Sequence, residues 1–247
     1  MRRVGGRRLG PRVGEATSAA LRAGLAMNDS FAGFGWSRST GQPKGLRRFA
    51  TFEAMEAHRL EGLARVMARR SRPSAAGCLD RLSDMTDDTT SRPATADDLK
   101  RLVRALEDAG ARYLLIGAYA LLAHGYQRAT VGIDLLVEAS IDNGERVRRA
   151  LLVLPDRCAA DIDPAWFLEG QNIRVADEIT VDLLFSPCAQ TYEMLKPHEQ
   201  IVDLDGVAVR TVSLHGLLLT KQTPRPQDIH DSLLLRRAIA AASHEDE

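Results

Sequence analysis

The segment RYLLIGAYALLAHG, which runs from Arg112 to Gly125, restricts the possible folds more than any other part of the sequence. RYLLIG is a short apolar run that ends in glycine, as many buried strands do, and AYALLAHG has the composition of a helix that begins directly after it. A glycine at the junction permits a turn that is too tight for a side chain. The segment therefore predicts a strand, a glycine turn and a helix, which is a unit of α/β proteins.

The sequence on both sides extends this unit. Upstream, Thr95 and Asp98 form a variant of the capping box, and the helix that they begin carries apolar residues at helical spacing, namely Leu99, Leu102, Val103 and Leu106. Downstream, VGIDLLVE and DEITVDLLF alternate like strands, and each carries one carboxylate, Asp134 or Asp182, on its less apolar face. We therefore expect a small mixed sheet flanked by helices over residues 95–247.

Composition supports one substantial core with at most a small appendage, because 45% of the 247 residues are hydrophobic and 27% are charged. No apolar run approaches the roughly 18 residues that a membrane span needs. The three cysteines are far apart and form no CxxC pair, which indicates neither a disulfide framework nor a zinc site. These features favour a protein of the cytoplasm with no membrane partner.

The N-terminal fifth of the chain differs from the rest in charge. Residues 1–50 hold ten Lys and Arg against two acids, whereas the net charge of the whole chain is zero. We expect a basic, poorly ordered extension over residues 1–46, an amphipathic helical segment over 47–70 and a linker over 71–94. The extension could be a transit peptide, a nucleic-acid-binding arm, or sequence upstream of a natural start at Met85. In the last case, a chain that begins at Met85 should fold as stably as the whole.

The segment LIGAYALLAHGYQRATVGIDLLV resembles the signature of the polymerase-beta-like nucleotidyltransferase superfamily, and more narrowly that of the bacterial minimal and toxin-type nucleotidyltransferases. The resemblance covers about residues 96–240. The matching positions, in the order of the family pattern, are Gly117, Ala118, Tyr119, Ala120, His124, Gly125, Arg128, Thr130, Asp134, Asp182, Lys221, Arg225 and Asp228. One element departs from the pattern: Gly132 stands where the family carries the first of two strand aspartates.

The resemblance implies a nucleotidyltransferase fold and transfer of a nucleotide from an NTP to a hydroxyl of transfer RNA or of a protein. It implies that Asp134 and Asp182 are catalytic and bind Mg²⁺, which neutralises the phosphates during such a transfer. The implied nucleotide-binding residues are Gly117, Ala118, Arg128, Thr130, Lys221 and Arg225. In this scheme the Gly117 turn lets the backbone approach the triphosphate, and the basic side chains add positive charge.

Gly132 weakens the expected metal site, because residues i and i+2 of a strand project to the same side and only Asp134 remains of that pair. Glu138 and Asp142 do not easily reach the same point. We therefore expect impaired transfer in this chain and a gain of Mg²⁺-dependent transfer on Gly132→Asp. The alternative is an inactive protein that acts as a binding or toxin–antitoxin regulatory partner. Residues 47–70 resemble the short helical proteins encoded beside such toxins, so a small antitoxin-like partner is also expected.

Each predicted site residue also has a structural interpretation. Gly117 could serve only a tight turn, and Asp182 could be an edge residue. Lys221 and Arg225 are equally compatible with a solvated helix start that Asp228 caps. A third hypothesis is that the basic N-terminal segment tethers a domain without catalytic activity to nucleic acid.

Overall fold

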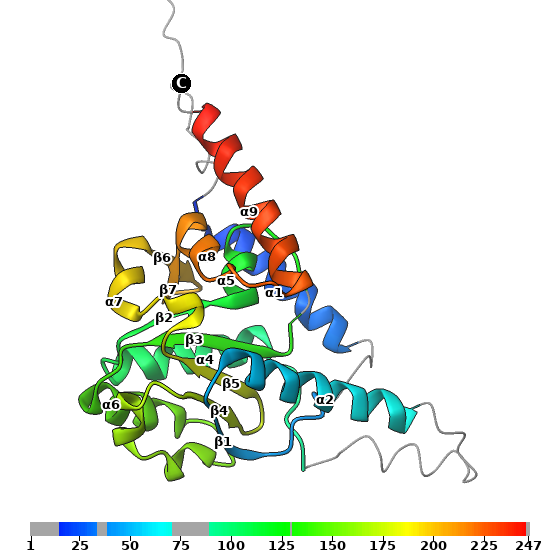
Figure 1. The fold of residues 1–247 in the computed structure, drawn as a ribbon, viewed down its shortest axis with the longest axis vertical. Coiled ribbons are helices and arrows are strands. Elements are labelled where there is room, and N and C mark those ends of the chain that lie inside the picture. Colours follow the sequence, from blue (N-terminus) through cyan, green and yellow to red (C-terminus); the bar gives the residue numbers. More distant parts are fainter. Residues whose placement is uncertain (1–14, 34–38, 71–88, 129, 246–247) are drawn as a thin grey trace, which may run out of the picture.

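The computed structural model describes residues 15–33, 39–70, 89–128 and 130–245. Within these residues a mixed sheet of seven strands has the order β1-β4-β5-β3-β2-β7-β6, and helices lie on both of its faces (Figure 1). The pairs β3–β5 and β2–β7 are parallel, and the remaining neighbours are antiparallel. The expectation of an α/β protein with a mixed sheet flanked by helices is therefore confirmed.

The strands are β1 (Gly45–Phe49), β2 (Tyr113–Ile116), β3 (Gly132–Val137), β4 (Asn172–Ala176), β5 (Thr180–Leu184), β6 (Glu199–Leu204) and β7 (Val207–Val212). The α-helices are α1 (Ser18–Gly33), α2 (Phe52–Arg70), α4 (Ala96–Asp108), α5 (Gly117–Ala123), α6 (Ile141–Leu151), α7 (Tyr192–Leu195), α8 (Leu214–Leu219) and α9 (Pro226–Glu245). In the described ranges, none of these helices is both long enough and apolar enough to cross a membrane.

The strand, glycine turn and helix expected around Gly117 are present as β2 and α5. Gly117 has a φ of +66°, a conformation that side chains rarely adopt, so the chain can turn from strand to helix without an intervening loop. The predicted capping box also forms, because the Thr95 hydroxyl accepts from the Asp98 amide and the Asp98 carboxylate accepts from the Thr95 amide. Local sequence therefore determines how this part of the fold begins.

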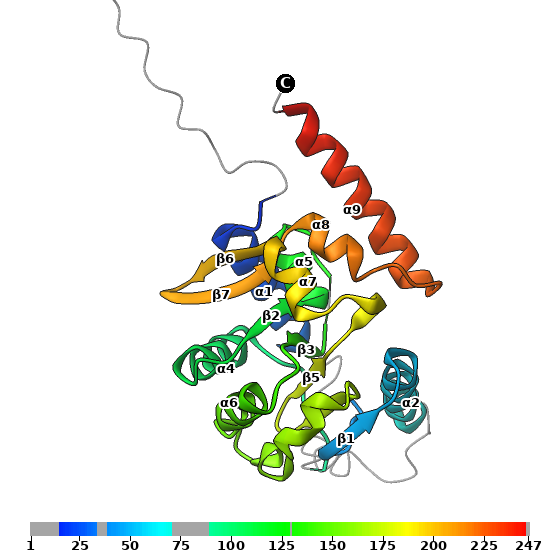
Figure 2. The same cartoon turned by 60° about the vertical axis from the view of Figure 1, so that its left-hand side comes forward.

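The two faces of the sheet bury different clusters. On one face, α4 and α6 pack on the apolar side chains of β3 and β5, a cluster that includes Leu99, Leu102, Leu106, Val147, Ile133, Leu135, Val137 and Val181. On the other face, Met55 of α2, Leu217 of α8 and Leu235 of α9 pack with Leu114, Ile116 and Leu136. The end of α9 projects beyond the sheet (Figure 2). The second face carries the charged residues considered below.

The N-terminal part of the chain belongs to this fold to a greater extent than the sequence predicts. Leu21 and Leu25 of α1 are 0% and 1% exposed and join the core, and β1 pairs along its length with β4. The expected lack of fixed structure over residues 1–46 is thus wrong for Ser18–Gly33 and for the start of β1, while residues 1–14 and 34–38 lie outside the described residues. The strand GLRRF has only two apolar residues, Leu46 and Phe49, so its sequence gives a weak strand signal, and for this reason it was not predicted.

The helix expected within residues 47–70 is present as α2, but its buried face differs from the apolar stripe in the sequence. Met55 is fully buried, whereas Leu60, Leu63 and Met67 are 55%, 43% and 62% exposed. The helix instead turns Gly62 inward, where a Cβ atom would lie only 2.8 Å from the carbonyl oxygen of Gly41. Close backbone packing at a glycine therefore decides which face is buried, and apolar periodicity does not report it.

The expected linker over residues 71–94 is also partly built into the fold. Its first part, 71–88, lies outside the described residues. At its end, Ser91 donates its amide to Gln42, and Arg92 forms ion pairs with Asp98 and Glu178. This end of the segment consequently ties the N-terminal part of the chain to α4.

Candidate functional site

Four charged residues form a row across four neighbouring strands beneath α2. The register pairs Arg47 of β1 with Arg174 of β4, Arg174 with Asp182 of β5, and Asp182 with Asp134 of β3. Residues paired in this way project to the same face of a sheet. The row therefore places two cations side by side and, next to them, two carboxylates. Its acidic end is the site that the sequence predicts.

Arg174 binds Asp182 through two parallel hydrogen bonds. Its Nε and Nη2 atoms lie 2.7 Å from the two carboxylate oxygens, and the residues are only 1% and 6% exposed. The third guanidinium nitrogen, Nη1, lies 3.3 Å from Gln42 Oε1 and 3.2 Å from the carbonyl oxygen of Met55. Bidentate pairs of this kind are among the stronger charge-assisted contacts in proteins. Both oxygens of the Asp182 carboxylate are thus already engaged.

Asp134 lies against the backbone of Gly117. A Cβ atom at Gly117 would lie 2.0 Å from Asp134 Oδ2, so glycine is required there by close approach as well as by its positive φ. Among the described residues, the carboxylate of Asp134 forms no hydrogen bond or ion pair. Burial, followed by the Asp182 and Glu56 carboxylates, raises the pKa of Asp134 to about 7. Asp134 is thus the carboxylate of the row that is left for a ligand or a proton.

Gly132 pairs in register with Thr180, two residues before Asp182. A Cβ atom at Gly132 would lie 3.2 Å from the Thr180 carbonyl oxygen, which is tight but close to ordinary contact. The Thr180 hydroxyl is buried and has no hydrogen-bond partner among the described residues. The strand therefore has nearly enough room for a side chain at this position.

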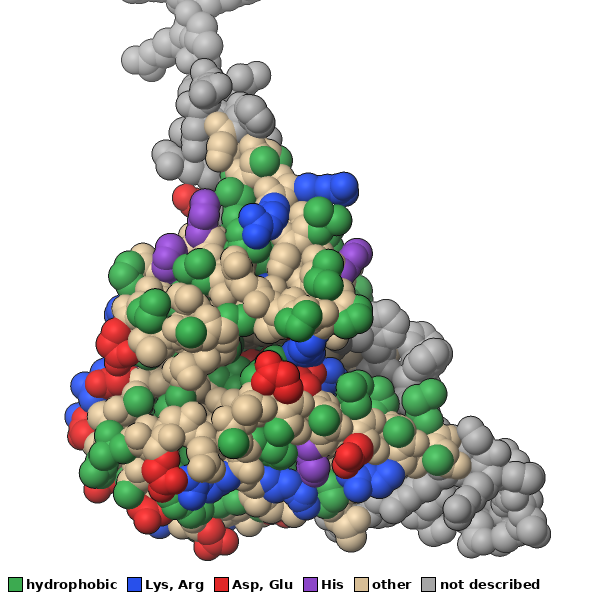
Figure 3. Space-filling model, viewed as in Figure 1, with side chains coloured by type: hydrophobic (Ala, Val, Ile, Leu, Met, Phe, Trp, Pro, Cys, Tyr) green, Lys and Arg blue, Asp and Glu red, His purple; other side chains and the backbone are tan. Residues whose placement is uncertain are grey.

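Helix α2 brings further charges to the row. Glu56 lies 2.8 Å from Arg59 of the same helix and 2.6 Å from Arg225, whose guanidinium also lies over the ring of Phe52. Burial of Glu56 acts in the opposite direction, but the Arg59 and Arg225 guanidiniums lower its pKa overall. Glu56 is therefore ionised at neutral pH and joins α2 to the start of α9. Figure 3 shows acidic and basic side chains around a hollow between α2 and the α8–α9 part of the surface.

The basic residues predicted to bind the nucleotide come together here, but each one faces an acid. Lys221 Nζ lies 3.1 Å from Asp228 and 3.3 Å from Asp231, and Arg128 lies 2.7 Å from Asp231. Arg225 pairs with Glu56 and with Asp228. Both aspartates are 1% exposed, so these pairs are buried on the acidic side. The positive charge expected for a triphosphate is therefore compensated inside the protein.

Ala118 and Thr130 have structural contacts. Ala118 is buried, and the Thr130 amide donates to Asn28 of α1 while its hydroxyl donates to the carbonyl oxygen of Gly132. His124 likewise contacts the carbonyl oxygen of Val212 through Nε2. These contacts hold α1, β3 and β7 in place beside the site.

Glu138 and Asp142 do not replace the missing strand carboxylate. Glu138 forms an ion pair with Arg112 beyond the far end of β3, and Asp142 pairs with Arg112 and Arg146 at the start of α6. The sequence-based expectation that neither residue reaches the Gly132 position agrees with this arrangement.

The donor set does not fit a two-magnesium site. Asp182 is bound at both oxygens by Arg174, Gly132 offers no ligand, and Glu56 is held between two arginines. In the described part of the chain, no group of three or more His, Cys, Asp or Glu residues is arranged to hold a metal ion. Mg²⁺ prefers six oxygen ligands, and here Asp134 alone offers a carboxylate without a competing cation bound to it.

Sequence reasoning missed Arg174, although a signal for it exists. The segment NIRVADEITVDLL contains two strands separated by three residues, and such a hairpin places Arg174 opposite Asp182. An arginine in an otherwise apolar strand, next to a strand with an aspartate at the mirror position, indicates a buried ion pair. Gln42, His58 and Asp231 carry no comparable local signal.

Comparison with known proteins adds no assignment: the chain matches no family model and no curated protein.

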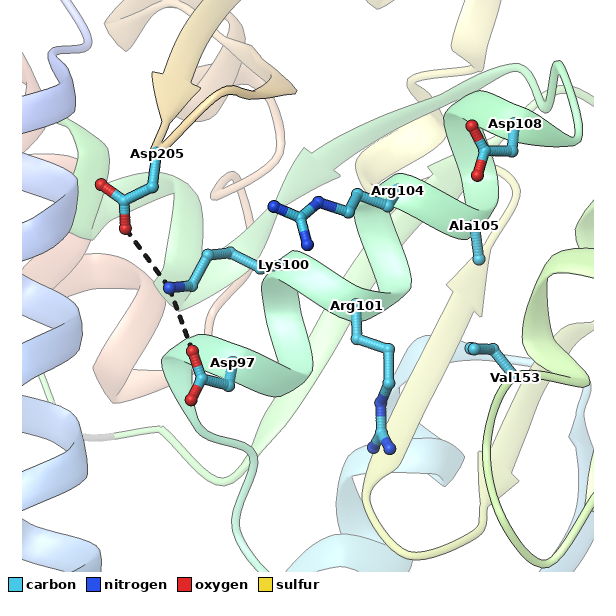
Figure 4. A pocket seen from close by; sticks show the side chains of 8 residues that line it. All are labelled: Asp97, Lys100, Arg101, Arg104, Ala105, Asp108, Val153 and Asp205. Atoms are coloured by element: carbon cyan, nitrogen blue, oxygen red, sulfur yellow. Dashed lines mark hydrogen bonds and ion pairs between the residues drawn. The ribbon is translucent and has the colours of Figure 1, made fainter.

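A second concavity on the surface lies away from the predicted site. It lies along α4 beside the turn between β6 and β7, and Figure 4 shows Lys100 bridging Asp97 and Asp205 at 3.0 Å and 3.3 Å. These groups are paired on the surface, and none of the residues predicted from the sequence lines this pocket.

Proposed function

We propose that this chain is a nucleotidyltransferase-like protein that has lost metal-dependent transfer and acts as a regulatory binding partner. The observation that carries the proposal is the buried pair of Arg174 with Asp182. In a transferase of the kind that the sequence resembles, this carboxylate would bind a metal ion. Here a guanidinium supplies the positive charge instead, and it comes from the neighbouring strand of the same chain.

The energetic argument concerns the cost of freeing Asp182. Breaking a buried ion pair costs about 3 to 5 kcal/mol, because one charge is then left without a partner. A metal ion that displaced Arg174 would have to recover this energy while gaining two carboxylates at most. Such an exchange is unfavourable for Mg²⁺, which gives up its water reluctantly.

The position of α2 supports the regulatory part of the proposal. Its residues Met55, Glu56 and His58 contact Arg174 or Arg225, so the helix lies over the row of charges. Residues 47–70 are the segment that resembles antitoxin-like helical proteins. We infer that this segment covers the site in cis, and that the partner of this protein binds the covered form.

The test is incorporation of label from the four NTPs in the presence of Mg²⁺, with transfer RNA and protein acceptors. We expect wild-type protein to give no more product than Asp134→Asn, a nearly isosteric change that removes the free carboxylate. The sequence alone predicts a gain of transfer on Gly132→Asp, but we now expect this single variant to remain inactive, because Arg174 still binds Asp182. Wild-type incorporation that Asp134→Asn abolishes would contradict the proposal and would support transfer as the function.

A second measurement separates loss of metal binding from lack of the right acceptor. A ligand that binds only the folded state raises the midpoint of thermal unfolding. Because we expect the wild type not to bind Mn²⁺, its midpoint should be the same with and without the ion. The double variant Gly132→Asp with Arg174→Gln has two carboxylates on β3 and a third, that of Asp182, on β5, without the guanidinium. A midpoint raised by Mn²⁺ in this variant alone would support the replacement of a metal by Arg174.

A further inference from the structure

At the basic end of the charged row, hydrogen-bond donors face one another without enough acceptors. Arg47 and Arg174 are cross-strand neighbours, and the imidazole of His58 from α2 lies between them. His58 Nε2 is 3.0 Å from Arg47 Nη1, and His58 Nδ1 is 3.3 Å from Arg174 Nη1. Both ring nitrogens thus face guanidinium groups.

A neutral imidazole can accept only one hydrogen bond, because its other nitrogen carries a proton. Guanidinium groups are donors only. One of the two contacts of His58 therefore sets a donor against a donor. Arg174 Nη1 already has Gln42 and Met55 as acceptors, so the shorter contact, that of His58 Nε2 with Arg47, is the hydrogen bond. The other N–H groups of Arg47 have no hydrogen-bond acceptor or acid partner among the described residues.

The surroundings of His58 are rich in positive charge, and the side chain is half-buried. The largest charged influences on the imidazole come from Arg47 on β1, Arg174 on β4, and Arg65 and Glu61 on α2, so three cations act against one acid. Partial burial and these three arginines lower the pKa of His58. Figure 3 shows Lys and Arg side chains gathered with a histidine along the lower edge of this face, beside α2.

We propose that Arg47, His58 and Arg65 form a binding site for a phosphate group, whose oxygens accept the donors that the protein leaves without acceptors. A phosphate monoester carries about −1.5 to −2 charge at neutral pH and three acceptor oxygens, which matches a site with two arginines and one protonatable histidine. Arg47 binds the phosphate through its planar guanidinium, and His58 adds a positive charge beside it when it is protonated. The phosphate belongs to a free small molecule or to a nucleic-acid backbone.

This site lies at the opposite end of the row from Asp134, with Arg174 and Asp182 between them. The proposal therefore holds whether or not the acidic end transfers nucleotides. It also predicts a proton linkage, because a bound anion stabilises the imidazolium form of His58. Binding takes up a proton, so affinity falls as the pH rises through the range in which His58 titrates.

Arg48 provides a matched control, because it is the next residue of β1 and carries the same charge on the opposite face. Its guanidinium pairs with Glu169 and lies 4.7 Å from the Trp166 ring centroid. Removing Arg48 therefore changes the net charge as much as removing Arg47 does, but leaves the His58 site intact. Attraction of phosphate by overall charge would weaken equally in both variants.

The experiment is calorimetric titration of the full chain with inorganic phosphate at pH 6 and pH 8, with thermal unfolding as a check on folding. We expect Arg47→Gln to weaken binding at pH 6 at least about tenfold, as loss of a charge-assisted hydrogen bond does. Arg48→Gln should leave binding within about twofold of wild type. The His58 ring-proton resonance, assigned with His58→Gln, should shift on addition of phosphate.

A parallel titration with a short single-stranded RNA distinguishes the sources of the phosphate. Binding of RNA that Arg47→Gln weakens and that inorganic phosphate displaces would identify a nucleic-acid backbone as the ligand, and binding of inorganic phosphate alone would identify a free phosphate. The proposal fails if neither probe binds, if Arg48→Gln weakens binding as much as Arg47→Gln does, or if the His58 resonance does not move. If Arg47→Gln does not fold, Arg47→Lys replaces it, with weaker binding expected because Lys lacks the planar fork.

Discussion

Separating Arg174 from Asp182 should reveal an ion pair whose two members depend on each other. Arg174→Met leaves the Asp182 carboxylate buried without its two 2.7 Å hydrogen bonds, and Asp182→Leu leaves the guanidinium without its main partner. Each single change should lower the free energy of unfolding by about 3 to 5 kcal/mol. The double variant removes both charges, so it should lose only about 1 to 2 kcal/mol, mainly through the hydrogen bonds of Arg174 to Gln42 and Met55.

Urea unfolding followed by circular dichroism measures the four free energies of this cycle. The coupling between the two positions should be several kcal/mol, since the singles together cost far more than the double variant. The exposed pair Lys196–Glu199 is the control, and its coupling should not exceed about 1 kcal/mol. Losses below about 1 kcal/mol in both singles, or a coupling no larger than that of the control pair, would refute the central role given to Arg174.

Further predictions concern the neighbouring residues. Gly117→Ala should lower stability by more than Gly206→Ala, since both positions have positive φ but only Gly117 would bring a Cβ atom to 2.0 Å from Asp134, and urea midpoints measure the difference. Lys221→Ala should cost more than about 1 kcal/mol because it leaves Asp228 and Asp231 buried with fewer partners, whereas Lys196→Ala should stay within about 0.5 kcal/mol. Leu21→Ala should lower the free energy of unfolding by about 2 to 5 kcal/mol in the same assay, whereas Leu60→Ala, at an exposed position, should change it little. A chain that begins at Met85 lacks the buried Leu21 and should therefore be less stable than the whole chain. Burial and the Asp182 carboxylate raise the pKa of Asp134 to about 7. The stability that the protonated Asp134 contributes is therefore fully present below the pKa of the unfolded state, near 4, and is lost as the pH rises through 7. Asp134→Asn should flatten this dependence in unfolding experiments at pH 5 and pH 8.

The parts of the fold that the sequence predicts are those whose signals are local. The capping box at Thr95, the apolar run before Gly117 and the alternation around Asp134 each depend on residues a few positions apart, and the corresponding elements form. By contrast, β1 is a short edge strand with two arginines, and its place is set by pairing with β4 over more than a hundred residues of sequence. Local patterns carry little information about such an element.

The same division applies to the site. That Asp134 and Asp182 lie side by side follows from two strands with one carboxylate each and from the order of the motif, and their register confirms it. The basic residues Lys221 and Arg225 are near the site as expected, but their partners Asp231 and Glu56 were not predicted as such. A charge in a sequence shows which ligand it could bind, whereas only the fold shows that another residue has already bound it.

The contacts of Arg174 connect the N-terminal part of the chain with the chemistry of the site. Its Nη1 atom faces Gln42, Met55 and His58, which are separated from it by 132, 119 and 116 residues in sequence. Without these residues one end of a buried guanidinium would lose its acceptors, at a cost that opposes its burial beside Asp182. The segment that includes β1 and α2 therefore stabilises the arginine that replaces a metal ion in our proposal. On that proposal, the glycine at position 132 and the helix over the site belong together, since a site without a metal needs an internal cation and an internal cation needs this cover.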